Sequence, residues 1–145
     1  QPLEEMLLEM QAKADPELVT SQSPVWKHKE MYTRASAFRR EFHYDFVQWH
    51  SKNGDSDPFV NGFLLTDTSG AIVGACSFRK KSDSQPLSWK LDWIWICPKE
   101  RRKGYLAARW KLFRERFGDF GLSHPVSDEM KAFLAKNGDS ALLEL

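Results

Sequence analysis

The chain has 145 residues and a mass of 16.8 kDa; 41% of its residues are hydrophobic and 28% are charged. These values predict one folded domain over residues 1–145 and exclude a disordered chain. No apolar run approaches the roughly 18 residues needed to cross a bilayer, and the acidic start, with Glu4 and Glu5, is unlike a secretory signal. Because two cysteines, Cys76 and Cys97, are too few for a disulfide scaffold, we expect reduced thiols, a cytoplasmic location and no membrane contact.

Positive charge gathers in one segment of a nearly neutral chain. The net charge is +1, from 21 basic and 20 acidic residues, so we do not expect the chain as a whole to attract nucleic acid. Residues 99–116, however, hold eight basic and two acidic side chains. This segment is suited to an anionic ligand, whereas the remainder of the chain is acidic.

Two helices are predicted before the first strand. Apolar residues at helical spacing predict an amphipathic helix over 3–14, which ends where Pro16 follows. Ser23 is a suitable N-cap for a second helix, with Pro24 at its first position.

The middle of the chain predicts antiparallel strands. Aromatic and polar residues alternate over 42–46, which is typical of a half-buried strand. Residues 50–61 are rich in turn formers and predict a loop. Strands over 62–66 and 71–78 flank the turn 67–70, which is a good hairpin signal.

The spacing of the apolar residues then changes from that of a strand to that of a helix. Residues 87–97 carry bulky side chains on both faces, which indicates a strand in the centre of the sheet. Leu106, Trp110, Phe113 and Phe117 form one stripe of a helix over 102–117, and Gly118 ends it.

The last segment predicts a strand over 120–123, a helix from Ser127 that closes at Asn137 and Gly138, and a final strand over 141–145. The whole order predicts an α+β or mixed α/β domain. Its parts are a helical segment to residue 37, antiparallel strands over 38–97, and helices with the last strands over 98–145.

The basic segment begins where a strand ends and a helix starts. Backbone N–H groups at a helix start have no partner within the helix and favour phosphate. Gly104 lets a diphosphate approach the backbone without a Cβ in the way, and Arg101, Arg102 and Lys103 add positive charge. On charge pattern alone, a solvated basic helix start is the alternative interpretation.

This stretch resembles the acetyl-CoA-binding motif of the GNAT superfamily of N-acetyltransferases. That motif is Arg or Gln, two residues, Gly, one residue, then Gly or Ala; Arg101 and Gly104 match it, and Leu106 stands at the third position. The hairpin 62–74 is similar to the second and third strands of the family, and the likeness covers about residues 60–137. A distant likeness to the C-terminal part of the cohesin acetyltransferases rests on 101–104 and on Ser123-His124-Pro125, without the zinc finger of that branch.

The resemblance implies a GNAT-like fold, with a mostly antiparallel twisted sheet between helices, and acetyl-CoA as cosubstrate. It also implies that the fourth strand splays from the fifth and pairs with the pantetheine arm, while the next loop holds the diphosphate. The residues implied in cofactor binding are Trp95, Ile96, Cys97, Arg101, Arg102, Lys103, Gly104, Tyr105, Leu106 and Ala107.

Direct acetyl transfer to an amine needs a base for the amine and an acid for the CoA thiolate. Asp92 is the first candidate for the base and His124 the second. A structural carboxylate and a turn histidine are their respective alternatives. The resemblance implies a tyrosine of the last helix as the acid, but no tyrosine follows Tyr105. Ser123 or Ser127 is therefore the candidate acid, with an N-cap as the alternative role of Ser127. An acetyl-cysteine mechanism at Cys97 is disfavoured, and His and Cys spacing predicts no metal site.

The resemblance implies an amine pocket shaped by two helices between the first and second strands. Here the predicted helices come before the strand predicted at 42–46, so the sequence leaves the acceptor open. The partners expected are acetyl-CoA and an amine acceptor, on a small molecule or a protein. A non-catalytic acyl-CoA-binding or protein-interaction module on the same fold is the alternative, and a nucleic-acid module is disfavoured by the acidic remainder. The apolar end, 141–145, fits either closure of the sheet or a homodimer contact.

Overall fold

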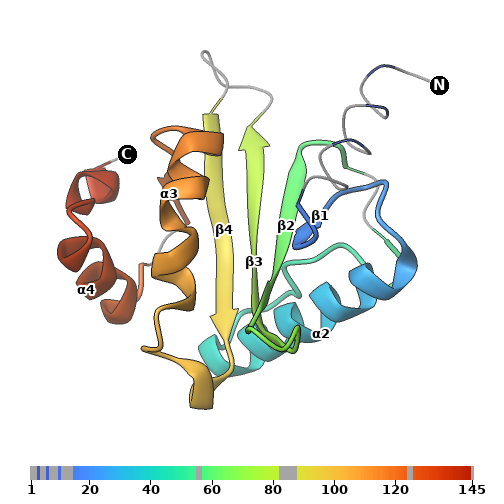
Figure 1. Cartoon of the computed structure of the whole chain (residues 1–145), viewed down its shortest axis with the longest axis horizontal. Helices are drawn as coiled ribbons and strands as arrows, with labels where there is room; N and C mark the ends of the chain where they lie inside the picture. Colours follow the sequence, from blue (N-terminus) through green and yellow to red (C-terminus); the bar gives the residue numbers. More distant parts are fainter. Residues whose placement is uncertain are drawn as a thin grey trace.

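The computed structural model describes residues 3, 6, 10, 15–54, 57–81, 88–123 and 126–144. Its elements, labelled as in Figure 1, are β1 (Leu18–Val19), α2 (Val25–Phe42), β2 (Val60–Thr66), β3 (Ile72–Lys81), β4 (Ser88–Ile96), η1 (Pro98–Glu100), α3 (Tyr105–Phe117), β5 (Gly121–Leu122), α4 (Asp128–Lys136) and η2 (Ser140–Glu144).

One five-stranded sheet runs in the order β1-β2-β3-β4-β5. The pairs β1–β2, β2–β3 and β3–β4 are antiparallel, and the pair β4–β5 is parallel. The β2–β3 hairpin turns where predicted, because the Asp67 carboxylate accepts hydrogen bonds from the backbone N–H groups of Ser69 and Ala71. The predicted strand 87–97 becomes β4, which lies between β3 and the short β5.

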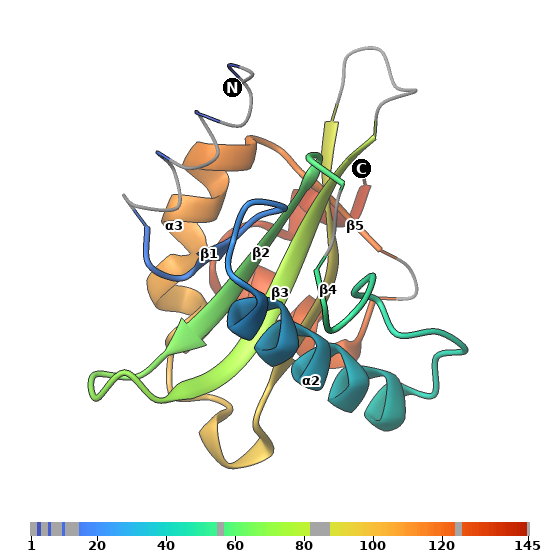
Figure 2. The same ribbon diagram turned by 90° about the vertical axis from the view of Figure 1, so that its right-hand side faces the viewer.

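Helices cover both faces of the sheet (Figure 2). The alternation of side chains along β2 explains how each face contributes to a core. Phe63 and Leu65 point to the face covered by α3 and α4, where they join Trp110 and Phe113 in one apolar core. Leu64 points to the opposite face, where it joins a second core with residues of α2. This arrangement confirms the predicted GNAT-like α+β class.

Helix ends follow their local chemistry. The Ser127 hydroxyl accepts a hydrogen bond from Met130 N at 3.1 Å, so Ser127 is the predicted N-cap of α4. Gly118 ends α3 in a backbone conformation with φ 67°. The N-cap of α2 is Pro24 rather than the predicted Ser23, whose hydroxyl instead accepts a hydrogen bond from Thr20 N.

The strand predicted over 42–46 is wrong. Helix α2 continues to Phe42, and His43 closes it in the left-handed conformation, with φ 60°. Phe42 and Tyr44 therefore contact Phe38 of the helix, with Tyr44 stacked on the Phe38 ring, whereas Phe46 is exposed. The first strand is instead β1, whose two residues are fully buried but too few to give a periodic signal. Helix α2 thus lies between the first and second strands of the sheet, not before them.

The last predicted strand, 141–145, is also wrong. Residues 140–144 form η2, and Leu142 N donates to Asp139 O. Leu142 is buried in the α3-side core, which accounts for the apolar pattern without a strand. Of the first predicted helix, positions 3, 6 and 10 are helical with exposed side chains, and its other residues lie outside the described ranges.

Candidate functional site

The two C-terminal strands of the sheet part from each other after a short contact. β5 pairs with β4 only at Lys90 and Leu91, and Ser123 N donates a last hydrogen bond to Leu91 O at 3.0 Å. Beyond this point β4 continues to Ile96 with its far edge unpaired by any other described strand.

A β-bulge marks the place where the strands part. Leu91 lies opposite Phe78 and Trp93 lies opposite Ser77, so Asp92 is the extra residue on β4. A bulge locally reorients the strand and its side chains. The Asp92 side chain is consequently presented at the open end of the β4–β5 pair.

A cavity of about 420 Å³ occupies this place. It is lined by the C-terminal end of α2, the middle of β4, the end of β5 and the start of α4. The lining residues are Phe38, Phe42, His43, Tyr44, Leu91, Asp92, Trp93, Ile94, Leu122, Ser123, Val126, Ser127 and Met130.

Asp92 is held by polar contacts on both of its carboxylate oxygens. Ser123 Oγ lies 3.4 Å from Oδ1, and Arg79 Nε lies 3.2 Å from Oδ2. Arg79 also donates to Asp57 at 2.9 Å, so its guanidinium bridges two carboxylates. The Asp92 side chain is 17% exposed, which leaves a carboxylate oriented within a largely apolar cavity.

Aromatic rings of α2 and of the segment after it form one wall of the cavity. The Phe38 ring lies 5.1 Å from Phe42, 5.0 Å from Tyr44 and 5.9 Å from Trp93, measured between centroids. His43 and Tyr44 were not predicted as site residues, because the segment that holds them was assigned to a strand. The spacing of Phe38 and Phe42, four residues apart, is the sequence signal that would have extended the helix.

The connection between β4 and α3 carries unusual backbone angles. Arg102 and Gly104 both have positive φ, 65° and 88°, and Gly104 is the N-cap of α3 without a side-chain cap. The first helical hydrogen bond runs from Ala108 N to Gly104 O. The N–H groups of Tyr105, Leu106 and Ala107 therefore donate to no described residue, and the helix starts later than the predicted residue 102.

The Arg101 side chain is engaged within the protein. Its Nε donates to Ile96 O at 2.7 Å, on the open edge of β4. Its two terminal nitrogens donate to the Glu41 carboxylate at 2.7 and 2.6 Å. Positive charge beside the start of α3 is supplied in addition by exposed Arg102 and by Lys103, which pairs with Glu100.

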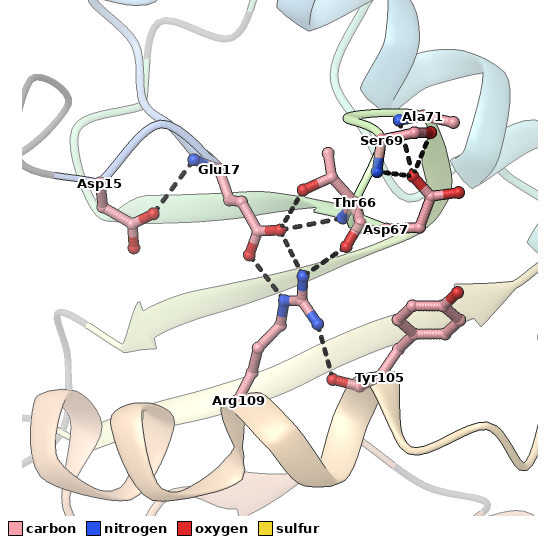
Figure 3. Close-up of polar contacts among 8 residues, drawn as sticks. All are labelled: Asp15, Glu17, Thr66, Asp67, Ser69, Ala71, Tyr105 and Arg109. Atoms are coloured by element: carbon pink, nitrogen blue, oxygen red, sulfur yellow. Dashed lines mark hydrogen bonds and ion pairs between the residues drawn. The ribbon is translucent and has the colours of Figure 1, made fainter.

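A second ion pair holds α3 against the sheet (Figure 3). Arg109 makes a two-pronged contact with the Glu17 carboxylate and donates to Thr66 O and Tyr105 O, both at 2.8 Å. Thr66 donates to the same carboxylate through its N–H and its hydroxyl. The network therefore fixes the first turn of α3 relative to β1 and β2.

The predicted site residues fall in two places. Asp92 and Ser123 meet in the cavity, whereas Arg101, Arg102, Lys103, Gly104, Tyr105, Leu106 and Ala107 form the β4–α3 connection and the first turn of α3. Trp95, Ile96 and Cys97 lie between them, along the end of β4. His124 lies outside the described residues.

No group of three or more His, Cys, Asp or Glu side chains that could hold a metal ion occurs among the described residues. Within the same ranges, no helix combines the length and apolar character needed to span a membrane.

The five-stranded mixed sheet with its covering helices fits a GNAT-like α+β fold. Solved structures of acetyltransferases share this fold. The acetyltransferase domain of xEco2, bound to a K105-CoA conjugate, is 14% identical with a TM-score of 0.60, over 82% of this chain and 84% of that one. GCN5 of Tetrahymena is 12% identical with a TM-score of 0.58, over 83% and 75%.

A third structure, a ribosomal-protein-alanine N-acetyltransferase from Brucella melitensis biovar Abortus 2308, is 15% identical with a TM-score of 0.53, over 83% of this chain and 86% of that one. No protein-family model and no curated protein sequence matches the chain. The predicted resemblance to GNAT proteins, including a cohesin acetyltransferase, is thus confirmed at the level of the fold.

Proposed function

We propose that this protein is an acetyl-CoA-dependent N-acetyltransferase that moves an acetyl group directly to a primary amine. The observation that carries the proposal is the divergence of β4 from β5, which opens the β4 edge beside the cavity that holds Asp92. A thioester placed along that edge would end beside a carboxylate and a hydroxyl. The GNAT fold supports the proposal, because that fold is shared with acetyltransferases.

The β4–α3 connection is the proposed site for the CoA diphosphate. The N–H groups of Tyr105, Leu106 and Ala107 lack described partners, and the positive end of the helix dipole adds to their attraction for phosphate. Arg102 and Lys103 would supply the side-chain charge, whereas Arg101 contributes its backbone position. The pantetheine arm would pass Trp95, Ile96 and Cys97 on the way to the cavity.

Asp92 is the proposed base. An amine attacks a thioester only in its neutral form, so one proton must first leave it. Asp92 would take that proton, directly or through one water. The amine nitrogen then forms a bond to the thioester carbonyl carbon, and the C–S bond breaks. The acetyl group ends on the nitrogen, which releases a second proton as the amide forms, and the CoA thiolate must gain one proton.

Ser123 is the proposed acid. Its hydroxyl contacts Asp92, so it can give its proton to the thiolate and regain one from the protonated carboxyl. The ammonium loses two protons in all: one passes through Asp92 and Ser123 to the thiolate, and the other goes to water. His124, the second candidate base, follows directly in the chain and remains a proposal to be tested by His124→Ala.

The function is tested by incubation of the protein with acetyl-CoA and amines of four classes: lysine-containing peptides, peptides with free α-amines, aliphatic polyamines and amino sugars. We expect one class to yield an acetylated product with an equal amount of released CoA. CoA binding without product from any class would contradict the enzyme and favour a non-catalytic acyl-CoA-binding module. Absence of both binding and product would contradict both functions.

A further inference from the structure

Glu41, in the last turn of α2, gathers three hydrogen bonds from two other parts of the site. Arg101 donates two of them, at 2.7 and 2.6 Å, and Trp95 Nε1 donates the third at 3.0 Å. Both charged side chains are about one-third exposed, at 33% for Glu41 and 35% for Arg101. The Glu41–Arg101 pair differs from ordinary surface ion pairs, most of which contribute little to stability. Arg101 donates two parallel hydrogen bonds to the carboxylate, and Trp95 adds a third donor.

The three groups come from elements with different roles. Glu41 precedes Phe42, which lines the cavity. Trp95 lies on the open part of β4, and Arg101 opens the connection to α3, where Arg102 and Gly104 adopt left-handed angles. The cluster therefore joins the cavity wall to the connection whose N–H groups face the proposed diphosphate.

Arg101 is also bound to the strand itself, through Ile96 O at 2.7 Å. Its guanidinium is thus occupied by one carbonyl and one carboxylate, which fixes the residue directly before Arg102. A loop already held in its binding conformation loses less entropy when its ligand binds. Removal of the carboxylate would free the guanidinium and leave the loop to be ordered by the ligand.

We propose that Glu41 is a positioning residue for the CoA-binding connection and acts through Arg101. This inference rests on the proposed function, because it takes the β4–α3 connection as the CoA site. It assigns Arg101 a structural task, to hold the connection, and leaves contact with phosphate to the backbone N–H groups and to the side chains of Arg102 and Lys103.

The test uses CoA as the probe and isothermal titration calorimetry as the measurement. Glu41→Gln retains the shape of the side chain and removes its charge. We expect its Kd for CoA to rise about tenfold, which corresponds to about 1.4 kcal/mol, with the melting temperature of the free protein little changed. In acetyl transfer we expect the KM for acetyl-CoA to rise while kcat is retained, a split that a general loss of structure would not give.

Glu115→Gln is the matched control, because Glu115 is exposed on α3 and its only described ion pair is a 4.0 Å contact with Lys111. We expect no change in its CoA affinity. Arg101→Gln should weaken binding as Glu41→Gln does, and the double variant should be no weaker than Arg101→Gln alone, since the two residues act through one contact. Glu41→Asp, which keeps the charge, should recover part of the affinity.

Unchanged CoA affinity in Glu41→Gln would overturn the inference. Tighter, more salt-dependent binding would also overturn it, because Arg101 would then be a phosphate ligand restrained by Glu41. Failure of the proposed function would give a different result from failure of this inference. The unaltered protein would then bind no CoA, whatever the variants do.

Discussion

The Oγ atom of Ser123 lies 3.4 Å from Oδ1 of Asp92, so the end of β5 meets the bulge of β4 at one point of the cavity. The two residues are far apart in the chain and come from strands that pair only briefly. Their contact places an acceptor of protons beside a hydroxyl, at the position where the two strands separate. This is the geometry on which the proposed acetyl transfer depends.

Asp92→Asn should lower kcat by about a hundredfold or more, because general acid–base groups contribute about 10²–10⁴ to a rate. The amide can keep contact with Ser123, and Arg79 retains its ion pair with Asp57, so we expect the fold and acetyl-CoA binding to persist. Steady-state kinetics and calorimetry on the same sample check both expectations.

The matched control for Asp92 is Asp119→Asn, at an exposed carboxylate that pairs with Arg114 at the surface. It should leave kcat unchanged, since exposed pairs of this kind contribute little. Full activity in Asp92→Asn would show that the base is another group and would contradict the assignment.

The two cysteines should differ in reactivity. Burial raises the pKa of the Cys76 thiol, and Cys76 has no exposed surface, whereas Cys97 is partly exposed at the end of β4. An aromatic disulfide reagent should therefore modify one thiol in the folded protein and both in denaturant.

Saturating acetyl-CoA should slow the modification of Cys97, because the pantetheine arm is proposed to pass it. The rate in the presence of ATP provides the comparison. An unchanged rate of Cys97 modification with bound acetyl-CoA would place the cofactor elsewhere.

Glu17 should make stability depend on pH. Burial alone would raise its pKa, but hydrogen bonds from Arg109 and Thr66 and the charge of Arg109 outweigh burial, so the pKa lies below its ordinary value of 4.5. The unfolded chain then takes up the proton first as the pH falls. The stabilisation is complete above about pH 4.5 and is lost as the pH falls through the lower, folded-state pKa.

Glu17→Gln should therefore reduce the free energy of unfolding by about 3 kcal/mol near neutral pH, since it leaves Arg109 partly buried without its carboxylate. The difference from the unaltered protein should shrink in acid. Urea denaturation across this pH range is the measurement. A difference that stays constant down to low pH would show that the Glu17 charge is not the cause.

Two glycines in the sheet should respond unequally to alanine. A Cβ at Gly74 would lie 2.5 Å from the backbone oxygen of Trp95. At Gly62 it would lie 2.6 Å from Met31 Cε, the end of a flexible side chain, and 3.0 Å from the Trp49 ring, so it would meet side chains rather than backbone. Gly74→Ala must displace β4 itself and should cost about 3 kcal/mol, against about 1 kcal/mol for Gly62→Ala. Chemical denaturation compares them, and equal costs would contradict the close backbone approach at Gly74.

The parts of the fold with strong local signals were predictable from the sequence. The 67–70 turn, the stripe of α3 and the Ser127 cap each depend on neighbours in the chain. The first strand escaped prediction because two residues carry no period, and its burial comes from contacts with β2, far along the chain. The alternation at 42–46 was misleading, because Phe42 ends α2 and Tyr44 packs back on Phe38 of the same helix, so neither ring needs a strand for its contacts.

The candidate site was likewise predictable from the sequence only in its local parts. The basic connection and Gly104 stand in one short segment, and their sequence pattern predicted an anion site. The partners Glu41, Arg79 and Tyr44 come from distant segments, and no spacing links them to Asp92 or Arg101. Only the three-dimensional arrangement joins the cavity wall, the bulge and the connection.

The most direct test of the account is the melting temperature of the protein with acetyl-CoA, CoA or ATP, for the unaltered chain and for Gly104→Glu. Gly138→Glu is the matched control, because both glycines have positive φ, 88° and 74°, and open space where a Cβ would lie. A ligand at about 100 times its Kd adds about 2.7 kcal/mol of stability. We predict a rise of several degrees with acetyl-CoA and CoA but not ATP, retained in Gly138→Glu and lost in Gly104→Glu. No rise in the unaltered protein, or an equal rise in both variants, would contradict acetyl-CoA binding at the start of α3.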